Sequence, residues 1–487
     1  MKYNNLKKGS LLVQALVFGS ISVVIIGGLI SWAGINIKAS RLAVYREQAL
    51  QISEAGIDYY RWHLAHNSTD YQDGTGHAGP YVHDFYDKDD IKIGTFTLTI
   101  TPPLIGSTLV NIQSDGKVLA DPTVVRKIKV RLGIPSLAKY AYVTNSVVYY
   151  GAGDEIFGPV HSNSGVGFWN GNPKPIAHNV VSSALATFVD NIAGCSGTHF
   201  GVFTCVPASD PAPPAAVPNR PDVFMSGRQF PVPVIDFTTI SADLSLIKAS
   251  AIANGYYRAA SGGLGYKVVL KANDTFDVYK VVSFLPVPNN QCKNNYAGGA
   301  QAGWGTWSIN TVNGSTVLLA SNVAFPANGL MFFEDNVWVE GTINTARLTI
   351  GAGVFPVNVA TYKNIIVNND LKYTNFDGSD AIGLIAQGNF LVGMASLNDL
   401  TIDGAIIAQN GQTIRYYYSA NCAPWTFRTT LRTYGMLASN GQGYFYYGNS
   451  GYQNQPSSYD PNFLYGPPPS FPLTSDQYQI ISWTEVQ

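Results

Sequence analysis

The chain has 487 residues, of which only 13% are charged, and its formal net charge at pH 7 is −1. Its lysines and arginines are scattered mostly singly, which excludes the basic stripe by which proteins hold nucleic acid. The length exceeds that of one ordinary domain, so we expect the chain to divide. Low charge and abundant glycine and tyrosine indicate an exported structural protein.

The N-terminal part contains a membrane-seeking segment. No charged residue lies between Lys8 and Lys38, and residues 11–37 are almost entirely apolar. About 20 apolar residues cross a bilayer core of about 30 Å, so membrane lipid is the first expected partner. Two alternatives are a cleaved secretory signal, whose apolar region is usually shorter, and a plain anchor whose preceding lysines stay in the cytoplasm.

A third interpretation comes from the stretch KKGSLLVQ at residues 7–14, which resembles a type IV pilin leader. The resemblance implies that a prepilin peptidase cleaves between Gly9 and Ser10 and that the apolar helix is retained. The family usually has a glutamate where this chain has Gln14, and a neutral amide makes a weaker hydrogen bond than a carboxylate. Since minor pilins and pseudopilins sometimes lack that glutamate, the resemblance implies one of these, associated with pilus or pseudopilus subunits.

We therefore divide the N-terminal part into a basic leader, residues 1–9, and one transmembrane and stalk helix, residues 10–66. The helix is expected to continue because residues 38–66 keep apolar side chains at three- and four-residue spacings. At 1.5 Å per residue the segment would be about 80 Å long. Residues 67–140 begin with an acidic, turn-rich connector and then alternate apolar with polar, which predicts three strands of a small antiparallel sheet.

The remaining chain predicts a large β-rich head over residues 141–475, with inserted loops and a helix near 241–254. Segments beginning at residues 383, 404 and 435 repeat the order glycine, aliphatic, alanine, polar, glycine, which is typical of stacked coils. The fold class is thus mainly β with a long N-terminal helix, and the head is predicted to be a parallel β-helix or solenoid. A β-sandwich is the alternative, and the Asn313-Gly314 pair favours it. Residues 476–487 are expected to form a strand that caps the solenoid.

The four cysteines fit an oxidising compartment, because Cys195 and Cys205 bound a short loop and leave Cys292 and Cys422 to pair over a long distance. Two other pairings remain possible from the sequence. No C-x-x-C pair is present, so we expect neither a zinc site nor any other metal or cofactor.

We expect no enzymatic activity, although many β-helices are polysaccharide lyases or hydrolases and a membrane-tethered enzyme of that kind is the alternative function. Its active site would need paired carboxylates about 5 to 10 Å apart. Solvated strand positions and turn caps explain the candidate acids equally well. They are Glu334, Asp335, Glu340, Asp370, Asp377, Asp380 and Asp403.

The expected function is instead adhesion or assembly by a single-pass protein of a bacterial cytoplasmic membrane or pilus, with its head outside. Aromatic rings stack on sugar C–H groups, and Asn, Gln and Tyr form hydrogen bonds without the desolvation cost of a charge. A tyrosine-rich wall is therefore predicted to bind a surface glycan or protein, with the alternative that these rings are packed inside. Its members are Tyr416, Tyr418, Tyr444, Tyr446 and Tyr447.

Overall fold

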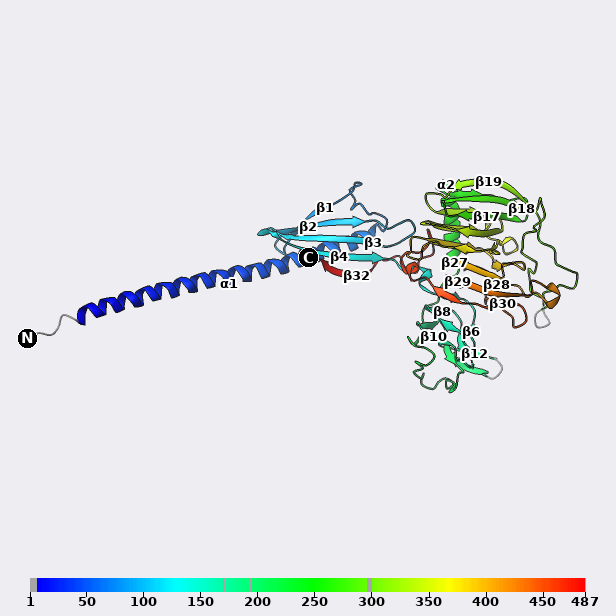
Figure 1. Cartoon of the computed structure of the whole chain (residues 1–487), viewed down its shortest axis with the longest axis horizontal. Helices are drawn as coiled ribbons and strands as arrows, with labels where there is room; N and C mark the ends of the chain where they lie inside the picture. Colours follow the sequence, from blue (N-terminus) through cyan, green and yellow to red (C-terminus); the bar gives the residue numbers. More distant parts are fainter. Residues whose placement is uncertain (1–6, 170, 192–194, 296–299, 487) are drawn as a thin grey trace, which may run out of the picture. The chain divides into compact units, whose positions relative to one another are not determined.

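The computed structural model describes residues 7–169, 171–191, 195–295 and 300–486 (Figure 1). The chain divides into two compact units. The stalk unit comprises Met1–Pro102, Val110–Gly133 and Gln477–Gln487, and the head comprises Pro103–Leu109 and Ile134–Asp476. The head is therefore an insertion in the chain of the stalk unit.

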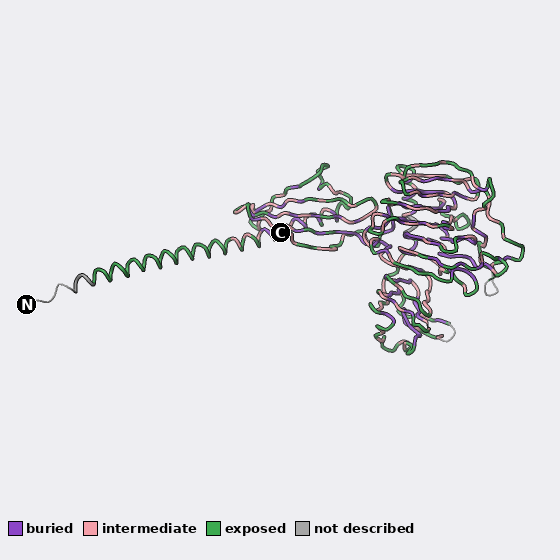
Figure 2. Tube along the Cα trace, viewed as in Figure 1, coloured by how far each residue is buried: buried purple, intermediate pink, exposed green. Residues whose placement is uncertain are grey.

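Helix α1 (Lys7–His66) is one uninterrupted helix, so the continuous helix expected over residues 11–66 is confirmed. Its apolar side chains over residues 11–37 are exposed, with Val24 at 73% and Ile35 at 69% (Figure 2). Among the described residues, it is the one helix long and apolar enough to cross a membrane by length and composition. Exposure of so much apolar surface is costly in water, since each buried CH₂ group is worth about 0.8 kcal/mol.

The second half of α1 packs on an antiparallel sheet. Its strands, in spatial order, are β1 (Tyr81–Tyr86), β2 (Lys92–Thr101), β3 (Val110–Val118), β4 (Asp121–Gly133) and β32 (Gln479–Val486). Three of these strands were expected. Strand β1 lies in the segment assigned to the connector, where YVHDFY places alternate side chains toward and away from the core.

The C-terminal strand corrects a prediction. It was expected to cap the solenoid, but β32 pairs antiparallel with β4 of the stalk unit, where Trp483 lies opposite Val130. Because Gly133 and Gln479 are also partners, the head is inserted between the ends of two neighbouring strands. A chain that leaves and re-enters one sheet at adjacent positions can accommodate a large domain without disturbing the pairing.

Small residues bring α1 close to the sheet. A Cβ atom on Gly116 would lie 2.1 Å from the carbonyl oxygen of Ala49, and one on Gly56 would lie 2.3 Å from Oγ of Ser114. The Ser53 hydroxyl donates to the Ser114 carbonyl oxygen at 2.6 Å. These contacts fix the helix against a core that includes Ile52, Tyr60, Leu64, Phe96, Leu98, Ile112, Ile128 and Val130.

The first part of the head consists of short strands and one 3₁₀ turn. They are η1 (Leu137–Lys139), β5 (Tyr142–Thr144), β6 (Val148–Tyr150), β7 (Glu155–Ile156), β8 (Val160–Ser162), β9 (Val166–Phe168), β10 (Ile176–Ala177), β11 (Val181–Ser183), β12 (Thr187–Asp190), β13 (Gly197–Phe200), β14 (Val202–Thr204) and β15 (Arg228–Gln229). Helix α2 (Thr239–Asn254) follows, close to the predicted helix at 241–254, and ends before Gly255, where a Cβ atom would lie 2.5 Å from the Leu330 carbonyl oxygen.

The second part of the head contains longer strands. They are β16 (Tyr256–Arg258), β17 (Gly265–Lys271), β18 (Thr275–Val281), β19 (Thr316–Ala324), β20 (Leu330–Phe333), β21 (Val337–Thr342), β22 (Arg347–Ala352), β23 (Ile365–Ile366), β24 (Leu371–Lys372), β25 (Ala381–Ala386), β26 (Phe390–Val392), β27 (Asp399–Ala408), β28 (Thr413–Arg415), β29 (Phe427–Ser439), β30 (Gly451–Asn454) and β31 (Ser457–Tyr459), with 3₁₀ turns η2 (Val359–Thr361), η3 (Ala420–Cys422) and η4 (Pro461–Leu464).

Most of these strands pair in parallel with a strand that follows one to four strands later in the chain. One ladder runs β16–β20–β22–β25–β27–β29, and a second runs β17–β21–β23–β26–β28. The three repeats lie on neighbouring strands of the first ladder, where Ala386 pairs with Ala408 and Gly404 pairs with Gly435. Strands β17, β18 and β19 pair antiparallel within the same hydrogen-bonded sheet as the ladders. Three smaller sheets complete the described part of the head: β7 with β10, β12 with β13, and β6 with β9 and β14. Closure of the parallel ladders into a β-helix stays a prediction.

The order of the first ladder does not follow the chain. Its last strand, β29, pairs with the first strand of the head, β5, and the ladder then continues through β8, β11 and β15. The two ends of the head therefore meet in the middle of the ladder. The two outermost strands of the ladder are β15 and β16. The segment that joins them includes α2, which packs on β16, β20 and β22.

Candidate ligand-binding cleft

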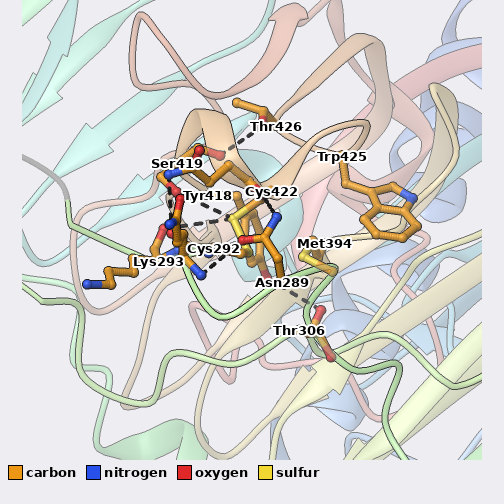
Figure 3. The surroundings of a disulfide bond; sticks show 12 residues. Asn289, Cys292, Lys293, Thr306, Met394, Tyr418, Ser419, Cys422, Trp425 and Thr426 are labelled. Atoms are coloured by element: carbon orange, nitrogen blue, oxygen red, sulfur yellow. Dashed lines mark hydrogen bonds between the residues drawn. A yellow bond between two sulfur atoms is a disulfide. The ribbon is translucent and has the colours of Figure 1, made fainter.

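The described residues between β18 and β19, 282–295 and 300–315, belong to a long loop that is tied to the rest of the head by a disulfide. Cys292 pairs with Cys422, with a Cα–Cα distance of 4.6 Å, and both cysteines are buried (Figure 3). Cys195 pairs with Cys205 at a Cα–Cα distance of 6.1 Å. Both separations are within the roughly 7 Å that a bridge can span, so the structure contains the pairing favoured from the cysteine spacing.

The loop is also fixed by hydrogen bonds to neighbouring ladder segments. The indole nitrogen of Trp338 donates to the Trp307 carbonyl oxygen at 3.0 Å, and the Asn368 side chain donates to the same oxygen at 2.8 Å. The Tyr418 hydroxyl donates to the Gly305 carbonyl oxygen at 2.8 Å. Because these acceptors are backbone groups of the loop, the loop is held against β21 and against the segments that follow β23 and β28.

A cleft of 730 Å³ lies where this loop meets β21. This volume is within the range of small-molecule sites, about 300 to 1,000 Å³. Its wall combines aromatic, amide and hydroxyl side chains with one acid and one lysine. The lining residues are Lys267, Leu285, Ser308, Ile309, Asn310, Thr311, Val312, Asn313, Gly314, Thr316, Trp338, Val339, Glu340, Asn368, Asn369, Ala395 and Trp425.

The charges in the cleft neutralise each other. Lys267 Nζ lies 2.7 Å from a Glu340 carboxylate oxygen, and the Asn369 amide donates to the other oxygen of that carboxylate. The ring of Trp425 is half-buried and lies on the wall. The cleft therefore offers an aromatic face and several amides to a neutral polar ligand.

Of the seven acids considered for catalysis, only Glu340 lines the cleft. The other six carboxylates form hydrogen bonds or ion pairs with residues of the head. Asp380 accepts hydrogen bonds from the backbone of Ala346, Thr374 and Asn375. Burial raises the pKa of Asp335, but hydrogen bonds from Ser261 and Lys363 outweigh that effect and lower it overall. The remaining partners are Lys248 for Glu334, Lys372 and Thr401 for Asp370, Ser379 for Asp377 and Tyr373 for Asp403.

Asp403 has an unusual pKa. Its side chain is 3% exposed and accepts one hydrogen bond from the Tyr373 backbone at 2.9 Å. Burial, with Asp370 and Asp460 nearby, raises its pKa to about 6. Burial also raises the pKa of Asp460. Neither Asp403 nor Asp460 lines the cleft, so neither can supply a second acid beside Glu340 there.

We expect the Asp403→Asn substitution to stabilise the protein at pH 7.5 but not at pH 4. Because the folded pKa is above the ordinary value of about 3.9, the folded state binds a proton that the unfolded chain has lost, and its stability falls as pH rises from about 4 through 6. Removing the charge should recover on the order of 2–3 kcal/mol at pH 7.5. Urea unfolding of both proteins at the two pH values measures the difference.

Asp377→Asn is the control for this comparison. Hydrogen bonds from Ser379 lower the pKa of Asp377, so this substitution should destabilise the protein at pH 7.5, opposite in sign to Asp403→Asn. A gain in stability for Asp403→Asn that is equal at pH 4 and pH 7.5 would contradict the assignment of the raised pKa.

The predicted tyrosine wall is wrong in part. Tyr416 is 4% exposed and Tyr418 is fully buried, and both pack in the cluster beneath the loop. Tyr444 and Tyr446 are exposed, and Tyr447 is half-buried with its ring centroid 5.8 Å from that of Tyr444. The wall fails because the loop covers the outer face of β28, which the local sequence does not reveal.

Residues 7–9 of the predicted leader are the first residues of α1, and residues 1–6 lie outside the described part of the chain. Gln14 is exposed on the helix, while the exposure of Gly9 and Ser10 falls outside the described part. Within the described residues, no group of three or more His, Cys, Asp or Glu side chains could hold a metal ion.

No protein-family model and no curated protein matches the chain. Among solved structures, the chain is similar to the crystal structure of the competence-associated pilin ComZ from Thermus thermophilus. The two are 12% identical, the match covers 91% of this chain and 98% of that chain, and the TM-score is 0.30.

Proposed function

We propose that this is a membrane-anchored, pilin-like surface protein that binds a glycan through its head. The observation that carries the proposal is α1, whose exposed apolar part is continuous with a stalk packed on a sheet. One uninterrupted helix would thus supply both the proposed anchor and the surface on which the sheet packs. The minor pilin or pseudopilin part of the proposal rests on Gln14, a neutral amide where the pilin family usually has a glutamate.

The proposal includes processing by a prepilin peptidase after Gly9 and contact of the exposed apolar side chains with lipid or with neighbouring subunits. Residues 11–37 expose an apolar surface. Lipid or neighbouring subunits would each cover this surface and so remove it from water. We also propose that the parallel ladders of the head close into a β-helix. The lateral pairing of β22, β25, β27 and β29 in constant register supports this architecture over a β-sandwich, whose sheets are antiparallel.

The proposed glycan site is the cleft beside Trp425. An indole ring presents an apolar face to sugar C–H groups, and the side chains of Asn310, Asn368 and Asn369 also line the cleft. The Glu340–Lys267 pair contributes no net charge, which favours a neutral sugar over an acidic one. The loop that forms the opposite wall is held by the Cys292–Cys422 bridge, so the site is preformed.

We expect Trp425→Ala to weaken glycan binding by the full-length protein in detergent at least tenfold. Such a loss corresponds to about 1.4 kcal/mol, within the value of one aromatic contact. Binding is measured on a glycan array and then by titration with the glycan that binds best. Trp62→Ala is the matched control, because Trp62 is exposed on α1 in the stalk unit and should not affect binding.

Trp425 also packs beneath the loop, so its truncation could loosen the cleft. Asn310→Ala supplies an independent test, since this side chain lines the cleft and is only half-buried. Weakened binding by both variants at an unchanged thermal midpoint supports the site. Unchanged binding by both, or binding lost only in Tyr444→Ser and Tyr446→Ser, would move the site to the exposed tyrosines.

A membrane-tethered polysaccharide lyase or hydrolase is the second candidate, and the presence of Glu340 and Lys267 in the cleft favours it. The Glu340 carboxylate would be the base and the Lys267 ammonium group the acid, a set that suits a lyase, whereas a hydrolase would need a second carboxylate in the cleft. Release of reducing ends or of unsaturated sugars by the wild type, lost in Glu340→Gln, would establish catalysis. Binding without turnover favours adhesion.

A further inference from the structure

Two arginines project into the interior of the stacked strands. Arg415 ends β28 and is fully buried, and Arg428 in β29 is 8% exposed. In the parallel ladders Arg415 pairs with Val392, and Arg428 pairs with Tyr452. Paired residues of adjacent strands point to the same side of a sheet, and Val392 and Tyr452 belong to the main core cluster. Both guanidinium groups therefore replace apolar side chains at core positions.

The two guanidinium groups approach the same backbone oxygen. Nη2 of Arg415 donates to the Met394 carbonyl at 3.1 Å, and Nη2 of Arg428 donates to it at 3.5 Å. Arg415 also donates to the Trp425 carbonyl. The other bonds of Arg428, to the carbonyls of Pro424 and Phe427, are 3.4 and 3.3 Å long. Two like charges thus lie close together, held mainly by neutral acceptors.

Several donors in this interior have no protein acceptor. Among the described residues, Nε and Nη1 of Arg415, Nε of Arg428 and Oγ1 of Thr413 are buried without a hydrogen-bond partner. Thr413 lies two residues before Arg415 on the same strand, so both side chains face the same side. The Tyr418 ring lies 4.7 Å from the Arg415 guanidinium carbon, but a ring face does not accept the in-plane N–H groups.

Neither arginine has an acidic partner within the described residues, where the ion pairs involve other side chains. Burial lowers the pKa of Arg415 to about 10 and lowers that of Arg428. A guanidinium group nevertheless stays protonated in proteins, so both side chains are charged at neutral pH. A buried charge is stable only when it is paired and its donors are satisfied, which points to an anion in this interior.

We propose that Arg415 and Arg428 bind a small inorganic monovalent anion of the halide class, with the Thr413 hydroxyl as a further donor. A halide fits because it accepts from several N–H and O–H groups at once and needs no donor of its own. A larger organic anion would need a path to a fully buried side chain. The anion lies behind the cleft, because Arg415 binds the carbonyl of Trp425 and both arginines bind that of Met394, next to Ala395 on the cleft wall.

The direct test is diffraction from crystals of the full-length protein prepared in detergent with bromide as the only halide. We expect an anomalous bromide peak in contact with the free donors of Arg415 and Arg428. Ordered water in hydrogen-bonding contact with those donors, without an anomalous peak, would overturn the proposal.

A second test measures thermal unfolding while chloride replaces gluconate at constant ionic strength. A ligand that binds only the folded state raises the midpoint with its concentration, so we expect a saturable rise for the wild type. The rise should disappear in Arg415→Met and in Arg428→Met and be reduced in the nearly isosteric Thr413→Val. Arg432 is exposed on β29, the strand that also contains Arg428, so Arg432→Met should retain the full rise of the unfolding midpoint with chloride.

The Thr413→Val variant keeps the test decisive if an arginine variant fails to fold. A wild-type midpoint that is insensitive to chloride, or a chloride effect that persists unchanged in all the interior variants, would overturn the halide site. Neither result depends on glycan binding, so the site and the proposed function can fail separately.

Discussion

Replacing Cys292 and Cys422 by serine is expected to lower the free energy of unfolding by about 5 kcal/mol. The bridge closes a loop with a sequence separation of 130, and the entropy removed from the unfolded chain grows with the logarithm of that length. Both cysteines are buried against Met394 and Tyr418, so the loss also opens a well-packed cluster. Denaturant unfolding of the oxidised wild type and of the double variant measures the effect.

The second bridge supplies the matched control. Cys195 and Cys205 are separated by 10 residues, so replacing both by serine should cost only about 2.7 kcal/mol by the same entropy relation. The Cys292/Cys422 variant should also lose glycan binding, because the loop it releases forms one wall of the cleft. Equal destabilisation by the two double variants, or a long-range variant with full binding, would contradict the structural role assigned to this bridge.

Much of the stalk unit could be predicted from local sequence. The charge-free interval between Lys8 and Lys38 and the helical spacing that follows both act within α1, so the helix was predicted over its whole length. Strand β32 was misassigned because its partner, β4, lies about 350 positions earlier in the chain. Alternating apolar residues predict that a strand exists, but not which of two sheets it joins.

The head was harder to predict for a related reason. The repeats near residues 383, 404 and 435 predicted neighbouring parallel strands because each repeat lies one segment from the next. The pairing of β29 with β5 joins the two ends of the head and leaves no such local repeat. Stacking order therefore had to come from the structure.

The candidate site was missed for a physical reason that concerns the loop between β18 and β19. Tyrosines near residues 416–418 were expected outside, whereas Trp304 and Trp307 of the loop pack over that part of the head. The cleft then forms at the loop's edge, beside Trp425, Asn368 and Asn369. These aromatic and amide residues are present in the sequence but lie far apart along it. Only the Cys292–Cys422 disulfide indicates that the loop is held near them.

Placing lysines in the middle of the apolar segment should remove the protein from the membrane. Each lysine at the centre of a membrane helix costs about 2.5–3.5 kcal/mol on insertion scales, so Val24→Lys with Leu29→Lys should cost about 5–7 kcal/mol. We expect the double variant to move from the membrane fraction to the soluble or degraded fraction. Val82→Lys is the control, because Val82 is equally exposed but lies on β1 of the sheet.

Retention of the double variant in the membrane fraction after a carbonate wash would contradict an anchoring role for residues 11–37. Loss of the Val82→Lys control from the membrane would instead show that any added charge disturbs the fold of the stalk unit.

The most direct test of the pilin-like account is the intact mass of the protein purified from its native membrane. The account predicts a mature chain that begins at Ser10, with the whole apolar segment retained, and accumulation of the uncleaved chain when Gly9 is replaced by valine. A mature chain that begins at Met1 would instead support a plain anchor. One that begins at Gly34, after the small-x-small run Ser31-Trp32-Ala33, would support a cleaved secretory signal. Either of these two masses would contradict the account.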